Sequence, residues 1–507
     1  MIKISKKYIR IYDTTLRDGE QTPGVSLTLE DKMQIAESLS ELGVDIIEAG
    51  FPQVSKGEFE TIKQLAAAGF NSDIIGLARV DEKDIEAVAE TGLKHIHLFI
   101  ATSDIHLKHK LKISKEEAIK QAVRGVEYAK NKGMRIEFSA EDATRTEIGY
   151  LKQVFKAVVD AGADRIDIPD TVGTSTPEKF SGIIKEIKDT VNVPISVHCH
   201  DDFGLSVANS IAGITAGATS AHSTINGIGE RAGNTSLEEL VMSLHHLYNM
   251  KTGINTKKIY NISRLVSRLT GVIVQPNKAI VGANAFGHES GIHTHGVLTK
   301  PLTYEPISPE LVGRQRWIQA GKHSGSHGLV SQLKEIGVDA NKTQVKEILN
   351  KVKEMGDKGK TLTDNDLRAI SETVTGLTES SERHIELQDV SVMTGLKSVP
   401  AASVRIIFNG KTYTTSETGV GPIDSALKSI QKITGNLANI RIQEFRMEAL
   451  TGGSDALAEV SIKVGDEQGN VASSRFAGED IVIASVQAMI DGINRLLQKR
   501  KRKEKQK

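Results

Sequence analysis

Short β-branched segments alternate with amphipathic helical segments from residue 8 to about residue 235, and this alternation constrains the possible folds most strongly. Such alternation predicts βαβ units and therefore a parallel sheet. The expected strands are Tyr8–Asp13, Val44–Glu48, Ile74–Ala78, His95–Ile100, Arg135–Ser139, Arg165–Ile168, Ile195–His200 and Ser220–Ile225. Helix-like segments between them include Leu29–Leu42, Lys56–Ala68, Lys115–Lys132, Gly149–Ala161, Pro177–Asp189 and Gly204–Ala216.

The number of strand–helix repeats, and the glycines that end the helices, indicate how the sheet is arranged. Glycines stand where several of these helices should end, at Gly43, Gly69, Gly133, Gly162 and Gly217. Eight βα repeats predict an α/β fold of the (β/α)8 TIM-barrel type, with an open doubly wound sheet as the alternative. The barrel is favoured because polar residues recur at the C-terminal ends of the strands, where a barrel carries its chemistry.

A chain of 507 residues is too long for a single core, so further domains are expected. Helices and loops follow the barrel, and from about residue 384 a new α+β pattern begins after the polar segment Gly376–Glu382. We therefore expect a barrel over 1–254, helical lid and linker subdomains over 255–382, and a C-terminal α+β regulatory domain over 383–498. The basic end, 499–507, is expected to be a disordered tail.

The composition excludes several classes of partner. Lysine plus arginine equals aspartate plus glutamate at 64 each, which provides no global field for nucleic acid or for a membrane surface. No apolar run is long enough to span a bilayer, and the N-terminus lacks the apolar core of a signal peptide. The single cysteine, Cys199, excludes an internal disulfide and is typical of a cytoplasmic protein.

Two histidines separated by one residue end the seventh expected strand. Side chains alternate across a strand, so His198 and His200 should point to one side and Cys199 to the other. Imidazole is a common metal ligand when other ligands converge with it. Taken alone, the pair fits half of a divalent-metal site and a hydrogen-bonded surface pair about equally well.

Barrel closure supplies candidate partners for this pair. Asp18 lies just past the first strand and Asn234 just past the eighth, so both should reach the same rim. Two imidazoles, a carboxylate and an amide oxygen suit Mg, Mn, Co or Zn with open coordination positions. The alternatives are a turn or N-cap carboxylate for Asp18 and a helix N-cap for Asn234.

Other polar residues fall on the same rim. Arg17 is a planar cation beside the expected metal, suited to a substrate carboxylate or a developing oxyanion. Glu48, expected to end the second strand, and Glu141, after the fifth, could orient Arg17 or a metal-bound water, or could be plain surface carboxylates. Thr171 could hydrogen-bond a substrate carboxylate or cap a loop.

The motifs that carry these residues resemble those of one enzyme family, the alpha-isopropylmalate/homocitrate/citramalate synthases. They are DTTLRDGEQTPGVS, IIEAGFP, EFSAEDATR, PDTVGT, VHCHDDFGLSVAN, NGIGERAGN, HESGIHTHG and KHSG, in order from residue 13 to 325. The resemblance implies a metal-dependent condensation of acetyl-CoA with a 2-oxo acid, followed by thioester hydrolysis. It also implies a homodimer whose active site is completed by the partner subunit.

The resemblance assigns roles residue by residue. Metal ligands would be Asp18, His198, His200 and Asn234. Arg17 and Thr171 would bind the oxo acid, with Glu48 as a further catalytic candidate. Glu141 matches a catalytic glutamate, whereas His293 and Tyr304 match catalytic residues that act on the partner's site.

The oxo acid would be distinguished by its side-chain pocket, for which the matching residues are Leu77, His97 and Ser139. This set resembles that of enzymes acting on 2-oxoisovalerate in leucine biosynthesis. Glu137 stands where homocitrate synthases commonly carry an arginine, and would repel the second carboxylate of 2-oxoglutarate. Pyruvate and 2-oxoglutarate are the alternative substrates, and carbon–carbon cleavage by a metal-dependent lyase or aldolase is the alternative reaction.

The C-terminal region resembles an amino-acid-binding regulatory domain, which implies feedback inhibition, with leucine as the expected effector. The residues that match its effector loops are Gly419, Gly421, Pro422, Ala449, Gly453 and Ala456. Judged without the resemblance, these glycines would only make tight turns.

Overall fold

The computed structural model describes residues 7–318, 321–335, 338–357, 364–375, 384–408, 410–449, 458–478 and 480–505. The chain divides into two compact units. The first runs to Gly287 and includes Glu305–Trp317, and the second comprises His288–Tyr304 and the chain from Ile318 onward. The expected linker Gly376–Glu382 and the effector candidates Gly453 and Ala456 lie outside the described residues.

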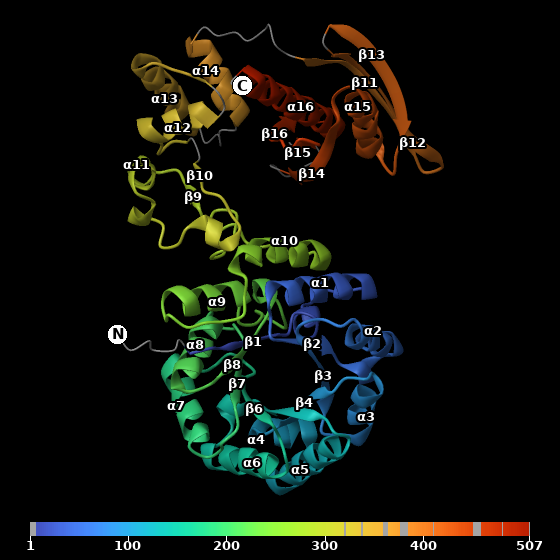
Figure 1. Cartoon of the computed structure of the whole chain (residues 1–507), viewed down its shortest axis with the longest axis vertical. Helices are drawn as coiled ribbons and strands as arrows, with labels where there is room; N and C mark the ends of the chain where they lie inside the picture. The colour runs from blue at the N-terminus through green and yellow to red at the C-terminus, as the bar shows by residue number, and fades with distance from the viewer. Residues whose placement is uncertain are drawn as a thin grey trace. The chain divides into compact units, whose positions relative to one another are not determined.

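The first unit is a closed barrel of eight parallel strands, which confirms the predicted fold (Figure 1). Its strands are β1 Arg10–Asp13, β2 Ile46–Gly50, β3 Asp73–Arg79, β4 His95–Ala101, β5 Arg135–Glu141, β6 Arg165–Asp170, β7 Ile195–Cys199 and β8 Ser220–Ser223. Register pairs β1 with both β2 and β8, so the ends of the first, seventh and eighth strands meet on one rim.

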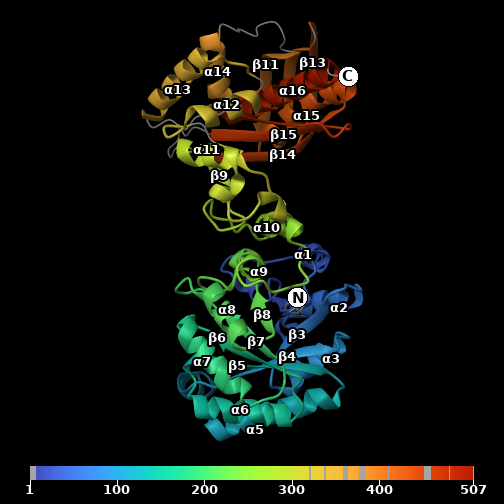
Figure 2. The same ribbon diagram turned by 60° about the vertical axis from the view of Figure 1, so that its left-hand side comes forward.

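A ring of helices surrounds the strands, as Figures 1 and 2 show. They are α1 Leu29–Leu42, α2 Lys56–Ala67, α3 Glu82–Glu90, α5 Lys115–Asn131, α6 Ile148–Asp160, α7 Pro177–Lys188, α8 Ser206–Ala216 and α9 Leu237–His246. The short helix α4 Asp104–His106 and the π-helical turn Leu107–Leu111 follow β4. The expected helical segments include neither α3 nor α9, although eight repeats require a helix at both places.

Local sequence signals fix the ends of α1. Thr28 forms a capping box with Asp31, which satisfies backbone donors at the first turn. Gly43 ends the helix in the left-handed region at φ 93°. A side chain at Gly43 would also collide with the carbonyl oxygen of Gly253, at 2.3 Å from the added Cβ. The predicted bounds of this helix are therefore correct at both ends.

Helix α10, Ile259–Thr270, packs with the barrel. Ile259, Ile262 and Val266 are buried within the barrel's hydrophobic core. This helix therefore belongs to the first unit, although it falls inside the expected 255–382 subdomains. The chain then passes through β9 Gly287–His288 and β10 Trp317–Ile318, which pair with each other.

The second unit opens with helices and has its own cores. Helices α11 Gly291–Thr299, α12 Ser326–Glu335, α13 Lys342–Asp357 and α14 Asp364–Thr375 precede the C-terminal domain. A small core joins α12, α13 and α14 through Leu329, Ile348, Val352 and Leu367. The helical prediction for this region is correct over the described residues.

The C-terminal domain repeats one arrangement twice, three antiparallel strands and a helix. The first copy contains β11 Ile385–Gly395, β12 Ser398–Phe408, β13 Lys411–Thr418 and α15 Pro422–Ala438. The second contains β14 Ile440–Ala449, β15 Ala458–Asp466, β16 Val471–Gly478 and α16 Ile481–Lys505. Residues from both copies share one core, as expected for a single α+β domain. The sequence of β16 carries no clear strand signal, because this Ser- and Ala-rich segment lacks β-branched alternation.

The expectation of a disordered tail over 499–507 is wrong for the described residues. Helix α16 continues to Lys505, and the Arg500 Nε lies 2.7 Å from the Asp466 Oδ2. Lysine, arginine and glutamate are good helix formers, so the amphipathic helix extends through the basic run. Among the described helices, none combines the length and apolarity needed to cross a membrane.

Candidate metal centre and active site

The His198–His200 pair has the geometry that strand alternation predicts. His198 lies in β7 and His200 follows it, and their Nε2 atoms are 3.1 Å apart. Cys199 points away into the hydrophobic core, where burial raises the pKa of its thiol well above the ordinary value. The two imidazoles therefore share one side of the strand end, and the thiol is not available to the same site.

Asp18 completes a buried triad with the two histidines. Its Oδ2 lies 3.4 Å from the His198 Nε2 and 3.9 Å from the His200 Nε2. Burial opposes the charge on this carboxylate, but Arg17 and the two imidazoles hold the pKa of Asp18 well below its usual range. Burial, and then His198, lowers the pKa of His200 to about 4, so this imidazole is neutral near pH 7 and offers a lone pair.

Asn234 reaches the same point from the loop after β8. It forms a β-bridge with His200, and its Nδ2 donates to the Asp18 Oδ1 at 3.1 Å. A side chain at Gly229 would strike the Asn234 amide at 2.0 Å, so the loop needs glycine there. Helix α9 begins after Ser236, so the alternative role of Asn234 as its N-cap is wrong.

The polar atoms of these four residues suit a divalent cation, because their hydrogen-bonding capacity is not fully used by the described part of the protein. The Asn234 Oδ1 is buried without a hydrogen-bond partner among the described residues. Two imidazole nitrogens also face each other beside a carboxylate. Buried polar groups are normally satisfied, so an ion among these atoms would explain the arrangement. The mixed nitrogen and oxygen donors suit an open site for Mg, Mn, Co or Zn.

Arg17 is held beside this triad by two carboxylates. Its Nε donates to the Glu48 Oε2 at 2.6 Å, and its Nη1 to the Asp18 Oδ2 at 2.7 Å. Burial disfavours both charges, yet the pairing raises the pKa of the guanidinium and, with His97, lowers the pKa of Glu48 to about 2. Glu48 does not end β2 as predicted, because the strand continues to Gly50; it orients Arg17 from inside the barrel.

A line of buried polar contacts runs from Glu48 across the barrel. The His97 Nδ1 lies 2.6 Å from the Glu48 Oε1, and its Nε2 lies 2.6 Å from the Ser139 Oγ. The Ser139 hydroxyl in turn contacts the Asp167 Oδ2 at 2.5 Å. Leu77 is the register partner of His97 on β3 and is buried. The three residues expected in the side-chain pocket thus lie on adjacent strands.

Glu137, which was expected to repel the second carboxylate of 2-oxoglutarate, is already paired inside the barrel. Its Oε2 accepts from the Arg165 Nη1 at 3.0 Å, and its Oε1 lies 3.0 Å from the His222 Nε2. Burial opposes ionisation, but Arg165 and His222 hold the pKa of Glu137 well below normal. A carboxylate committed to these partners provides no argument against 2-oxoglutarate.

The sequence reasoning missed His222 and Asp167. The His222 Nδ1 lies 3.3 Å from the His198 Nδ1, and its ring stacks on Tyr12 at a centroid distance of 3.9 Å. Together with Glu137 and Asp167 it forms a second buried cluster of potential ligand atoms. The available signal was alternation in β8, which places His222 on the inward face.

Glu141 and Thr171 lie on the same strand-end rim but are engaged with other groups. The Glu141 Oε1 accepts from the Lys110 Nζ at 2.5 Å and lies 3.6 Å from the His106 Nδ1. The Thr171 Oγ1 accepts from the backbone amide of Asp142 at 2.9 Å. Thr171 therefore has a positional role in the loop, in addition to any role toward a substrate.

His293 and Tyr304 belong to the second unit. Their rings lie 4.2 Å apart between centroids, inclined by 31°. His293 is on α11, and Tyr304 follows the short turn Pro301–Thr303. The structure thus brings these two expected catalytic residues together with each other.

The effector candidates that the structure describes lie beside the ends of two strands and at the start of a helix. Gly419 follows β13, and Gly421 is the N-cap residue of α15, which Pro422 begins. The Val420 amide between them donates to the Asp424 carboxylate at 2.9 Å. Ala449 ends β14, where it pairs with Ala458.

Three family models match the chain. The HMGL-like model covers residues 8–266, the homocitrate synthase post-HMGL domain-like model covers 280–360, and the LeuA allosteric (dimerisation) domain covers 361–497. The first match spans the barrel and the first part of α10, which is consistent with their common core.

Curated relatives match almost end to end. A 2-isopropylmalate synthase of Methanocaldococcus jannaschii is 54% identical, covering 97% of this chain and 96% of its own. A probable 2-isopropylmalate synthase of Methanopyrus kandleri is 52% identical, covering 97% and 99%. A putative (R)-citramalate synthase from the latter organism is 46% identical, covering 97% of both chains.

Proposed function

The chain belongs to the HMGL-like family, among the 2-isopropylmalate synthases and their citramalate synthase relatives, and on that premise we propose that it condenses acetyl-CoA with 2-oxoisovalerate to form 2-isopropylmalate. The single observation that carries the proposal is Arg17 held against the Asp18–His198–His200 triad at the ends of the strands. That arrangement brings a fixed cation and a divalent-metal site to one point, as a 2-oxo acid with adjacent ketone and carboxylate requires.

Arg17 would bind the carboxylate of the oxo acid. A guanidinium has five N–H donors, and Arg17 directs one to Glu48 and one to Asp18. The remaining donors are available for a substrate oxygen. Because Glu48 fixes the plane of the guanidinium, the cation is oriented before the substrate arrives.

Asp18, His198, His200 and Asn234 would hold the divalent ion, which supplies Lewis-acid polarisation of the ketone when bound. The proton of the acetyl methyl group would pass to a base, for which Glu141 and His293 are the candidates. Arg17 would stabilise negative charge that develops on the substrate oxygens. Thioester hydrolysis after carbon–carbon bond formation makes the overall reaction irreversible.

The pocket residues favour a neutral, branched side chain. Leu77 offers an apolar wall, whereas the His97 nitrogens and the Ser139 hydroxyl already contact Glu48, Ser139 and Asp167. The second candidate is pyruvate, because a relative named as a putative citramalate synthase is 46% identical.

The proposal is tested by the release of free thiol from acetyl-CoA. Purified protein with Mg or Mn should release thiol fastest with 2-oxoisovalerate, compared with pyruvate and 2-oxoglutarate at equal concentration. Faster turnover of pyruvate would make the enzyme a citramalate synthase. No release with any oxo acid would refute the condensing activity itself.

The metal centre has its own test. His200→Ala should lose stoichiometric Mn binding and nearly all activity while the circular dichroism spectrum is retained. His109→Ala is the matched control, because His109 is exposed on the turn after α4 and should bind metal normally. Wild-type metal stoichiometry in His200→Ala would remove His200 from the centre.

We further propose that His293 and Tyr304 act on the partner's barrel in a homodimer, and that leucine binds the C-terminal domain. The LeuA allosteric (dimerisation) match supports a dimer and regulation. Mixing inactive His200→Ala with inactive His293→Ala should restore activity, because a mixed dimer then contains one intact composite site. Failure to regain activity in demonstrated mixed dimers would mean that His293 acts within its own chain.

The effector is tested with leucine and isoleucine in parallel. Leucine should inhibit the full-length enzyme, and Gly419→Val should weaken that inhibition. A Cβ at Gly419 would approach the Asp424 carboxylate at 2.5 Å and so displace the turn before α15. Gly410→Val, in the β12–β13 turn with no atom within 4 Å of an added Cβ, is the steric control, although its φ of +78° adds some strain.

A further inference from the structure

A cavity of about 380 Å³ opens at the opposite end of the barrel from the metal centre. Its walls include Arg10, Asp73, His95, Arg135 and Arg165, the first residues of β1, β3, β4, β5 and β6. The proposed catalytic residues lie at or beyond the C-terminal ends of the strands, where barrel enzymes place their chemistry. This cavity is therefore separate from the site described above.

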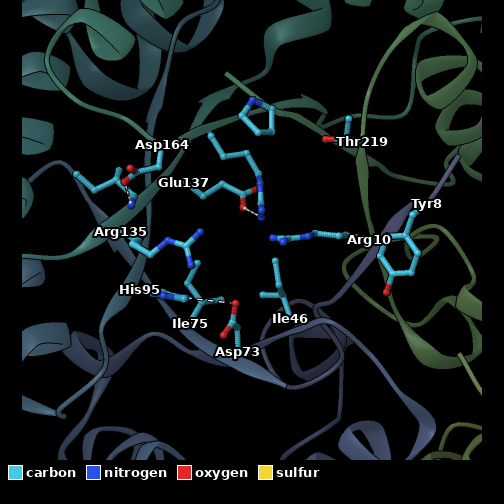
Figure 3. Close-up of a pocket in the computed structure, with 13 residues that line it drawn as sticks. Tyr8, Arg10, Ile46, Asp73, Ile75, His95, Arg135, Glu137, Asp164 and Thr219 are labelled. Atoms are coloured by element: carbon cyan, nitrogen blue, oxygen red, sulfur yellow. Dashed lines mark hydrogen bonds and ion pairs between the residues drawn. The ribbon is translucent and has the colours of Figure 1, made fainter. Parts of the chain in front are cut away.

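Two exposed arginines face each other across this cavity. Figure 3 shows Arg10 and Arg135 extending toward its centre from opposite walls. Neither has an ion pair with any residue that the structure describes. Like charges that converge repel each other, and an anion placed between them converts that repulsion into attraction.

A third arginine adds an unmet donor. Arg165 donates from Nη1 to the Glu137 Oε2 at 3.0 Å. Its Nε is buried and has no hydrogen-bond partner within the described part of the chain. A buried N–H without an acceptor is costly, so an oxygen at this position would be stabilised.

Two of the three acidic residues of the cavity are engaged by partners other than Arg10 and Arg135, and Glu137 offsets the charge of Arg165 alone. Asp164 accepts from the Lys130 Nζ at 3.0 Å and from the Ile136 amide at 2.8 Å. Glu137 is shared between Arg165 and His222. Asp73 is half exposed and lies 3.7 Å from the His95 Nδ1. The guanidinium groups of Arg10 and Arg135 are thus left as the uncompensated charges.

We propose that this cavity binds a small organic polyanion that carries at least two carboxylate or phosphate groups. Guanidinium groups match the planar fork of such oxyanions and bind them through paired hydrogen bonds. Ile46 and Ile75 supply apolar wall, and the volume exceeds that of a bare inorganic ion, so a carbon skeleton between the anionic groups fits better. The site is independent of the proposed catalytic function.

Isothermal titration of the full-length protein tests the proposal. The probes are tricarballylate, a tricarboxylate; glycerol 2-phosphate, an organic phosphate; and acetate, a singly charged control. At least one polyanion should bind with one-to-one stoichiometry and more tightly than acetate, and the tighter one identifies the anionic group. Its affinity should fall as salt rises. No measurable binding of either polyanion at millimolar concentration would overturn the proposal.

Paired variants locate the binding. Arg10→Gln with Arg135→Gln should weaken polyanion binding by roughly tenfold or more, because charge-assisted hydrogen bonds are lost. Thiol release should keep its kcat and KM. Arg124→Gln with Arg268→Gln removes the same charge from exposed positions on α5 and α10 and should bind as wild type. Unchanged affinity in the Arg10→Gln with Arg135→Gln variant would refute this location. That result would also be seen if the polyanion bound at Arg17 in the proposed active site. If that pair does not fold, each single variant should still weaken binding.

Discussion

Replacing Glu48 by glutamine tests whether a buried ion pair holds the substrate-binding arginine. Glu48 is fully buried on β2, with Arg17 on one carboxylate oxygen and His97 on the other. Glutamine keeps the shape and one acceptor oxygen but removes the charge. Arg17 would then retain only Asp18 as an ionised partner, at 2.7 Å.

The loss of stability expected for Glu48→Gln can be obtained in two ways. Removing one partner of a buried pair typically costs about 3–5 kcal/mol, and the remaining bond to Asp18 places this case near the lower end. Independently, the pKa of Glu48 falls from 4.5 to about 2, against the effect of burial and because of Arg17 and His97. That difference corresponds to about 3 kcal/mol of stability. We therefore expect Glu48→Gln to lose about 3 kcal/mol.

The pH dependence has a definite sign. The folded-state pKa of Glu48 is below its unfolded value, so its contribution is complete above pH 4.5 and is lost as the pH falls toward 2. The stability difference between wild type and Glu48→Gln should therefore shrink as the pH falls through that window. Carboxylates that do not interact with Glu48 or Arg17 titrate equally in both proteins and cancel in the comparison.

Hydrogen exchange of the β1 and β2 amides measures this local stability, because unfolding of a chain this large is not a single transition. Glu82→Gln is the matched control: its partner Arg124 lies at 2.6 Å, but both side chains are exposed, so it should lose less than about 1 kcal/mol. A loss below about 1 kcal/mol for Glu48→Gln, or a difference that does not shrink in acid, would refute the reasoning.

The same variant should impair catalysis. An Arg17 side chain that is free to turn no longer presents its donors in a fixed plane, and misplacement by about 1 Å can cost about a hundredfold in rate. We expect kcat/KM for the oxo acid to fall about ten- to a hundredfold, while the KM for acetyl-CoA changes little. An unchanged kcat/KM would mean that Arg17 does not need Glu48.

Three other perturbations follow from the same structure. Glu137→Arg would place a second guanidinium against Arg165 inside the barrel and should lower thermal stability by about 3–5 kcal/mol; a stable variant with altered substrate preference would contradict this. Thr28→Ala removes the capping box of α1 and should cost about 1 kcal/mol in the stability reported by hydrogen exchange of the α1 amides, whereas Ser26→Ala, exposed just before it, should cost nothing measurable. Truncation before residue 384 should abolish inhibition by amino acids but preserve metal binding; inhibition that survives would place the effector elsewhere.

The barrel could be predicted because its signals are local. Alternation of strand and helix patterns needs only neighbouring residues, and the capping box at Thr28 with Gly43 fixed both ends of α1. Strand ends were less certain: β2 continues past Glu48 because Gly50 still pairs with Gly76 of β3, across a register shift at the buried Ala49. The C-terminal tail was misjudged from its charge, although a basic run can extend a helix that is already formed.

The juxtaposition of Asp18, His198, His200 and Asn234 could also be anticipated, because barrel closure brings the ends of β1, β7 and β8 together whatever the side chains are. The deeper polar layer could not. Glu137 and Ser139 both face inward on β5, but two residues along a strand span about 6–7 Å. Which layer a residue joins depends on strand tilt and stagger, which the sequence does not display. Strand tilt and stagger place His222 of β8 and Glu137 of β5 at the same depth, where they contact each other across the barrel.

The depth of Glu137 changes how the enzyme would reject 2-oxoglutarate. Repulsion by Glu137 is not available, since Arg165 neutralises it below the pocket. The residues that do face the pocket offer a different reason. The His97 nitrogens contact Glu48 and Ser139, the Ser139 hydroxyl contacts Asp167, and Leu77 is apolar. Among these described residues no donor is left for a second carboxylate, and burying one unpaired would cost several kcal/mol, about a thousandfold in affinity. On the proposed function, selection against a dicarboxylate would follow from occupied partners, whereas selection between 2-oxoisovalerate and pyruvate would depend on the apolar surface that Leu77 contributes.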